Sequence, residues 1–98
     1  MITSFGDQAA SDLFHGKRSR YVRKLPADVC RVAVRKLDML NAAQDLRDLR
    51  SPPGNRLEAL KGDVSGLHSI RINDQWRLVF HWQGSDAEDV RILDYHRG

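Results

Sequence analysis

Seven side chains in the C-terminal part of the chain could act together on a phosphodiester. They are Glu58, Lys61, Arg71, Arg77, Asp94, Tyr95 and His96. Cleavage without a metal needs one group to take the proton of an attacking hydroxyl, a cation to stabilise the charged transition state, and another group to protonate the leaving oxygen. Arginine suits the second role because it keeps its charge and can bind two phosphate oxygens at once. This mixture of residue types therefore favours metal-independent phosphodiester chemistry.

Several of these residues also have an ordinary structural interpretation. Tyr95 and His96 fit amphipathic side chains at a strand end, which local sequence alone favours over catalysis. Asp94 points inward by alternation, so its carboxylate could instead hold a neighbouring strand or loop by hydrogen bonds. Residue types and spacing leave these alternatives open.

The segment 69–80 predicts a hairpin that would bring the two arginines together. Its alternating runs meet at Asn73-Asp74-Gln75, which is typical of a β-hairpin with a three-residue loop. With that loop, Arg71 pairs with Arg77 on one face, while the opposite face is apolar and must be covered. Like charges directly opposite each other destabilise an antiparallel ladder. The pair therefore either holds an anion or splays into water, and spacing alone favours neither.

Helices are expected before this hairpin and further strands around it. Asp7 is the expected N-cap of a helix over residues 8–14. A longer helix should start at Pro26 and place an apolar stripe on the hairpin. That stripe is formed by Val29, Ala33, Leu37 and Leu40. Short strands are expected at residues 2–5, 56–60 and 90–95. Residues 1–98 thus predict a single α+β domain, with N-terminal helices on one face of a mainly antiparallel sheet of about four to five strands.

Positive charge is concentrated in one stretch rather than spread evenly. The formal net charge is only +3, but eight cations lie between residues 17 and 36 and are opposed only by Asp28. The cations are Lys17, Arg18, Arg20, Arg23, Lys24, Arg31, Arg35 and Lys36. Such a stretch attracts phosphate backbones. It could equally be a solvated helix face or a docking surface for an acidic protein.

Other features of the sequence exclude several classes of protein. The single cysteine, Cys30, cannot form an internal disulfide and fits a small core side chain better than a nucleophile. Scattered histidines give no zinc-ligand spacing, so neither a metal nor a cofactor is expected. No apolar run approaches the length of a membrane helix, and no secretory leader is recognisable. The expected location is the cytoplasm, with no membrane partner.

Several motifs together resemble those of a known family. They are Leu-Lys-Gly-Asp at 60–63, Ser-Ile-Arg-Ile-Asn-Asp-Gln-Trp-Arg-Leu-Val-Phe at 69–80, Asp-Tyr-His at 94–96, Ser-Phe at 4–5 and the run 47–60. In this combination the chain resembles the HigB branch of the RelE/ParE toxin superfamily over nearly its whole length. The resemblance implies a type II toxin with the small RelE-like fold, which cleaves mRNA in the ribosomal decoding site with the 2′-hydroxyl as nucleophile.

The resemblance also implies a role for each candidate. Lys61 and Arg77 would stabilise the scissile phosphate, and Tyr95 would be the base or an orienting group. Asp94 and His96 would support substrate placement or proton transfer. The remaining residues implied to bind RNA are Arg71, Lys17, Arg18, Arg20, Arg23 and Lys24. Glu58 stands where some relatives have histidine; a carboxylate could serve as base but would repel phosphate, so slower or differently tuned cleavage is expected.

Partners and rival functions follow from the same resemblance. The implied partners are the ribosome with its mRNA and a HigA-type helix-turn-helix antitoxin, through which alone the toxin would reach operator DNA. A ParE-like, non-enzymatic inhibitor of DNA gyrase is the main alternative, because ParE proteins share the fold. A basic RNA-binding module without turnover is a second. The terminal Asp94-Tyr95-His96 together with Arg77 favours the nuclease.

Overall fold

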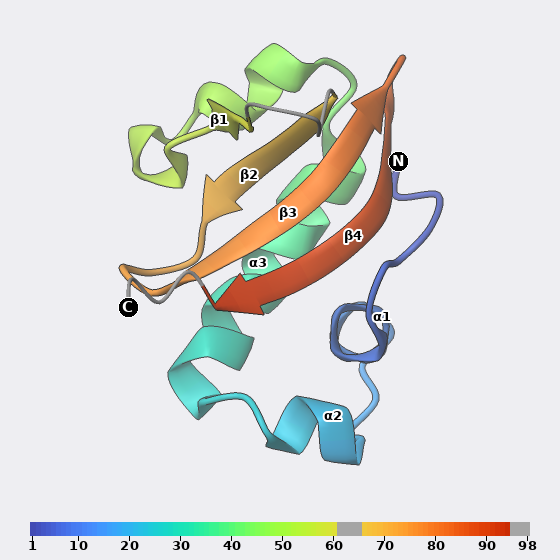
Figure 1. Cartoon of the computed structure of the whole chain (residues 1–98), viewed down its shortest axis with the longest axis vertical. Helices are drawn as coiled ribbons and strands as arrows, with labels where there is room; N and C mark the ends of the chain where they lie inside the picture. Colours follow the sequence, from blue (N-terminus) through green and yellow to red (C-terminus); the bar gives the residue numbers. More distant parts are fainter. Residues whose placement is uncertain (61–65, 95–98) are drawn as a thin grey trace.

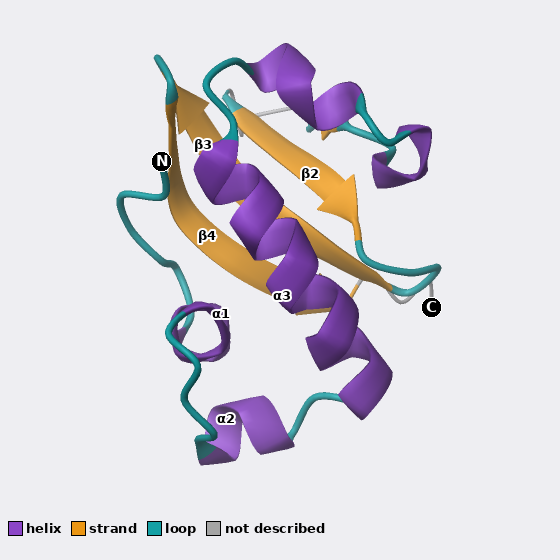
Figure 2. Cartoon of the chain, turned by 180° about the vertical axis from the view of Figure 1, so that it is seen from behind, coloured by secondary structure: helices purple, strands orange, loops and turns teal. Residues whose placement is uncertain are grey.

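Helices come first along the chain, and the sheet follows. The structure, a computed structural model, describes residues 1–60 and 66–94. Its helical segments are α1 (Gln8–Phe14), α2 (Arg20–Arg23), α3 (Ala27–Ala42) and the 3-10 turns η1 (Leu46–Arg50) and η2 (Pro53–Asn55). The strands are β1 (Glu58–Ala59), β2 (Leu67–Arg71), β3 (Trp76–Gln83) and β4 (Asp86–Asp94). They form an antiparallel sheet in the order β1-β2-β3-β4 with α3 across one face, which confirms the predicted α+β class (Figure 1, Figure 2).

The apolar stripe of α3 forms the core, as predicted. Its members, each at most 1% exposed, are Val29, Ala33, Leu37 and Leu40. The fully buried side chains of the hairpin in the same cluster are Ile70, Leu78 and Phe80. The helix begins at Ala27, with Pro26 as its N-cap rather than its first residue. No helix in the described part of the chain is long and apolar enough to cross a membrane.

The central hairpin has the predicted register. Arg71 pairs with Arg77 across β2 and β3. The loop is held by the side chain of Asn73, whose Oδ1 accepts hydrogen bonds from the backbone N–H groups of Gln75 and Trp76, both at 2.8 Å. An Asx-type contact of this kind replaces backbone hydrogen bonds that the loop itself cannot make.

Strand β4 contains a bulge that the alternation pattern did not predict. The pairing with β3 shifts register between Val79 and His81, and Asp89 has a left-handed φ of 53°. The extra residue lets Ala87 and Val90, three positions apart, both point into the core. Residues 2–5 therefore do not form the predicted strand. They make only single parallel bridges to β4, at Ile2 and Phe5, on either side of the bulge.

One carboxylate joins the N-terminal segment to the sheet. Asp7 caps α1 as predicted, since its Oδ1 accepts from the backbone N–H of Ala10 at 2.7 Å. Its Oδ2 accepts from the N–H of Ile92 in β4 at 2.9 Å. The two oxygens thus satisfy backbone donors from two elements far apart in sequence.

Replacing Asp7 with alanine should lower the free energy of unfolding by about 1–3 kcal/mol, because a helix cap and a strand amide both lose their acceptor. Urea unfolding followed by circular dichroism measures the change. Asp45→Ala is a matched control, because Asp45 caps only the exposed turn η1, and its loss should cost less. Equal losses in the two variants would contradict the link to β4.

A buried carboxylate also positions α2. Asp12, 4% exposed, accepts a hydrogen bond from Gln8 Nε2 at 2.8 Å. Its pKa is held below the usual 3.8, first by the Ser19 hydroxyl, then by Gln8, with Lys17 and His15 adding smaller electrostatic effects. Ser19 is the N-cap of α2. Asp12 therefore connects α1 to the start of the basic helical turn.

The lowered pKa of Asp12 predicts a specific acid dependence of stability. The folded protein binds this proton more weakly than the unfolded chain, so the carboxylate stabilises the fold above pH 3.8. That stabilisation is lost as the pH falls through the lowered pKa. Asp12→Asn should therefore unfold at lower urea concentration than the wild type at pH 7, and the difference should shrink as the pH falls below about 4. A difference that is independent of pH would contradict the assignment.

Candidate active site

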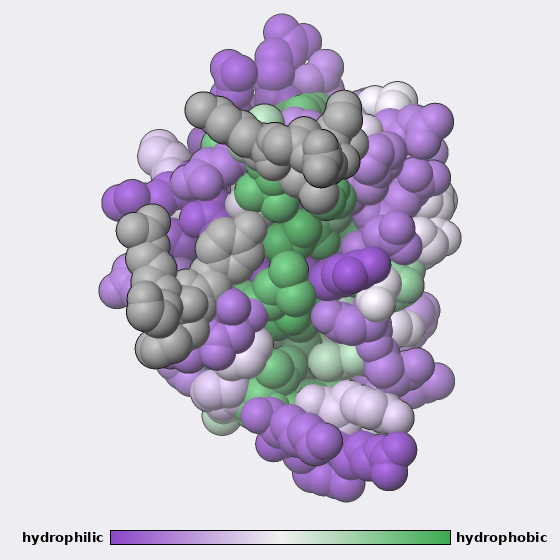
Figure 3. Space-filling view, viewed as in Figure 1, coloured by the Kyte–Doolittle hydropathy of each residue, from purple (hydrophilic) through white to green (hydrophobic). Residues whose placement is uncertain are grey.

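Three of the predicted site residues, Glu58, Arg71 and Arg77, lie on the face of the sheet opposite α3. Pairing across the strands places Glu58, Ser69, Val79 and Arg91 in one row of this outer face. Arg71, Arg77 and Leu93 form the next row. Figure 3 views this face and shows an apolar strip along its middle between polar margins. Charged groups and an apolar surface thus lie next to each other on the side of the sheet that α3 leaves uncovered.

Arg77 is held in one orientation by its neighbours. Its side chain is only 12% exposed. Its Nε donates to Ser69 Oγ at 2.9 Å, and its Nη2 donates to the backbone carbonyl of Arg56 at 2.6 Å. Ser69 is itself fully buried. A guanidinium with two such bonds has little rotational freedom left to lose when it binds an anion.

Arg71 and Arg77 carry like charges on paired positions, and acidic and carbonyl groups of the protein stabilise both guanidinium groups. Arg71 turns to Asp74 in the hairpin loop and forms an ion pair with it. Arg77 turns to β1, where its Nη1 lies 3.8 Å from Oε1 of Glu58. The prediction that Arg71 and Arg77 lie opposite each other is confirmed, but each guanidinium has its own acidic partner. Arg71 also contributes, after burial and Arg35, to a lowered pKa of Lys36, so positive charge extends from the sheet to α3.

The other predicted site residues fall into two groups. Glu58 lies beside Arg77, as expected, and its side chain is 58% exposed. Asp94 pairs with Trp76 at the end of β4 and so lies on the α3 side of the sheet, as the alternation predicted, although the residue is exposed there. Its carboxylate accepts from Gln75 Nε2 at 3.1 Å, so it does hold the hairpin loop. Lys61, Tyr95 and His96 lie outside the described residues, and their roles stay predictions.

The basic segment lies around α2, at the end of the molecule toward which β4 runs (Figure 1). Its five cations are all exposed: Lys17, Arg18, Arg20, Arg23 and Lys24. Arg20 donates to the hydroxyl of Tyr21 at 3.0 Å and lies 5.0 Å from its ring centroid. The 40% exposed Tyr21 was not predicted as a binding residue, although an aromatic ring within a basic run is the pattern from which base stacking is inferred.

Sequence reasoning also missed the groups that hold Arg77. Ser69 lies two residues before Arg71 and therefore on the same face of the strand, so alternation could have indicated that it lies near Arg77. The carbonyl of Arg56 carries no sequence signal. Among residues 1–60 and 66–94 no group of three or more potential metal ligands occurs. Burial raises the pKa of the Cys30 thiol, which favours the unreactive protonated form.

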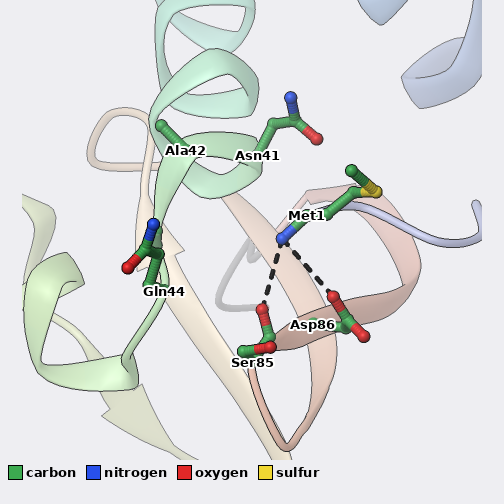
Figure 4. Close-up of a pocket in the computed structure, with 7 residues that line it drawn as sticks. Met1, Asn41, Ala42, Gln44, Ser85 and Asp86 are labelled. Carbon is green, nitrogen blue, oxygen red and sulfur yellow. Dashed lines mark hydrogen bonds and ion pairs between the residues drawn. The ribbon is translucent and has the colours of Figure 1, made fainter.

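Two of the surface hollows differ in how close they lie to the predicted site residues. One of about 560 Å³ surrounds the amino group of Met1, which lies 3.2 Å from the Ser85 carbonyl and 3.6 Å from Asp86 Oδ1 (Figure 4). None of the predicted site residues lines it. A smaller hollow of about 230 Å³ lies on the outer face, lined by Leu60, Leu67, Val79, Asp89, Arg91 and Leu93. Because Leu93 pairs with Arg77, this second hollow adjoins the candidate site.

Comparison with known proteins gives the family. The model of the RelE-like toxin of the type II toxin–antitoxin system HigB matches residues 3–96. Toxin HigB-1 of Vibrio cholerae is 50% identical over 75 residues, which cover 76% of this chain and 78% of that protein. Endoribonuclease HigB of Proteus vulgaris is 32% identical over 97 residues, covering 98% of this chain and 100% of that protein. This chain therefore belongs to the HigB family of RelE-like toxins of type II toxin–antitoxin systems.

Proposed function

We propose that this chain is an endoribonuclease that cleaves mRNA on the ribosome without a metal ion. The observation that carries the proposal is the fixed guanidinium of Arg77 on the helix-free face of the sheet, with Glu58 beside it. The relative from Proteus vulgaris, which matches nearly the whole chain and is named an endoribonuclease, supports the same activity. Inhibition of translation follows from loss of the message.

In the proposed reaction a 2′-hydroxyl loses its proton to a base, and its oxygen bonds to the adjacent phosphorus. The bond from phosphorus to the 5′-oxygen of the next nucleotide breaks as that oxygen gains a proton. Arg77 and Lys61 stabilise the negative charge that develops on the phosphate oxygens. Tyr95 and Glu58 are the candidate bases, while Asp94 and His96 assist placement or proton transfer.

The basic segment and Arg71 supply the wider contacts with RNA. Exposed arginines and lysines around α2 suit the phosphates of ribosomal RNA, and Arg71 suits the mRNA backbone near the cleaved bond. The apolar hollow beside Leu93 can cover one face of a flanking base. A HigA-type helix-turn-helix antitoxin completes the system and alone contacts operator DNA. The cytoplasm, where ribosomes translate, is the proposed location.

Arg77→Ala should reduce the rate of mRNA cleavage on the ribosome about a hundredfold or more, since removal of a transition-state stabiliser has effects of this size. Primer extension on mRNA in a translating extract measures the cleavage. Affinity for the ribosome should change little. Arg31→Ala, an exposed arginine on α3, is the control and should cleave like the wild type.

Primer extension, together with a supercoiling assay and a measurement of ribosome binding, separates the rival functions. A gyrase inhibitor of the ParE type would leave mRNA intact on ribosomes and block supercoiling, whereas a binding module without turnover would show weaker binding in Arg77→Ala and no cleavage at all. Either pattern would contradict the proposed nuclease activity.

Removing Arg20 and Arg23 together should weaken ribosome binding at physiological salt. The slope of log affinity against log salt concentration should become shallower by about 1 for each phosphate that the variant no longer binds. Cleavage at saturating toxin should stay near the wild-type rate, because the proposed role of these residues is to bind RNA phosphates and not to act on the bond that breaks. The control Arg47→Ala with Arg50→Ala removes two arginines from η1 and should leave the slope unchanged. An unchanged slope in the α2 variant would argue against RNA binding there.

A further inference from the structure

We propose that Asn55 is a positioning residue that sets the orientation of Arg77 by fixing the segment 51–58. The inference rests on the proposed function, since it takes Arg77 as the cation that stabilises the transition state. Asn55 contacts no predicted substrate position. Its effect on the reaction passes through the backbone of Arg56.

The side chain of Asn55 links three parts of the chain at a fully buried position. Its Nδ2 donates to the backbone carbonyls of Leu49 at 3.0 Å and Ser51 at 3.4 Å. Its Oδ1 accepts a hydrogen bond from Nζ of Lys36 on α3. This buried amide is costly to disrupt, because its bond to the buried Leu49 carbonyl would be lost without access to water in exchange.

The residue that follows Asn55 has an unusual backbone conformation. Arg56 lies in the left-handed region, with φ 45° and ψ 57°, and its N–H donates to the carbonyl of Pro53 at 3.1 Å. This conformation is unfavourable for a residue with a side chain, so the surrounding structure has to maintain it. The anchored side chain of Asn55, directly before it, can do so together with the hydrogen bonds of the Arg56 backbone.

The left-handed turn places two acceptors around Arg77. The carbonyl of Arg56 accepts from Nη2 at 2.6 Å, and Glu58, two residues on, lies 3.8 Å from Nη1. Ser69 holds Nε from the other side. Segment 51–58 therefore contributes the partners of Nη1 and Nη2, and Asn55 holds that segment against η1 and α3.

The matched substitution is Asn55→Asp. It keeps the size of the side chain and an acceptor for Lys36 but removes the donor to the carbonyls of Leu49 and Ser51. The single-turnover rate of mRNA cleavage on ribosomes should fall about tenfold to a hundredfold, with ribosome affinity within about twofold, because loss of alignment lowers the rate of the chemical step rather than binding. Asn41→Ala is the control for general destabilisation. It removes a hydrogen bond to the N–H of Ile2, on a different segment, and should leave the rate unchanged.

A double-mutant cycle separates positioning from general damage. If Asn55 acts through Arg77, Asn55→Asp should cause little further loss in an Arg77→Ala background. Equal losses in both backgrounds would overturn the inference, as would wild-type cleavage by Asn55→Asp when Arg77→Ala is inactive. Full cleavage by Arg77→Ala would instead overturn the proposed function itself. Should Asn55→Asp not fold, Lys36→Met removes the link from α3 and is tested by the same cycle, with the same outcomes deciding.

Discussion

The structure depends on strict alternation in β2 and β3. One set of side chains must be buried under α3, and this requirement fixes which residues face the other way. A slip of one residue would bury Arg71 and Arg77 and expose Ile70 and Leu78, which the core could not tolerate. The energy that stabilises the fold therefore also determines where the cations lie. No further interaction is needed to bring the strands of the candidate site into register.

Alternation alone leaves a problem that the rest of the chain solves. Two arginines opposite each other repel, and a guanidinium held between strands has little access to water. The hairpin loop supplies Asp74 to one of them, while segment 51–58 supplies a carbonyl and Glu58 to the other. The two guanidinium groups therefore point away from each other. Their charges are not neutralised within a closed core. The result is a cation that is fixed in direction and 12% exposed on the helix-free face of the sheet.

The sequence predicted those features that depend on local period and turn chemistry. The hairpin register, the α3 stripe and the Asp7 cap all follow from neighbouring residues. The β4 bulge did not, because the alternation of residues 90–95 carries no sign of the extra residue. The role of Asn55 was also missed, since Pro-Pro-Gly-Asn indicates only a chain break. Its side chain is fixed by Lys36 and Met39 of α3 as well as by nearby carbonyls, and contacts with α3 are not encoded in a local pattern.

Glu58 is the partner of Arg77 that a bound phosphate could displace in the proposed reaction. At 3.8 Å from Arg77 and more than half exposed, its carboxylate makes a loose ion pair of the kind that contributes at most about 1 kcal/mol. A phosphate that offers two oxygens to the same guanidinium forms shorter, charge-assisted bonds and can displace it. The bonds to Ser69 and the Arg56 carbonyl use other donor positions and can persist. In the proposed reaction the substrate therefore exchanges one weak partner of Arg77 for a stronger one. Under the proposed function, the displaced carboxylate is a candidate for the base that takes the 2′-hydroxyl proton.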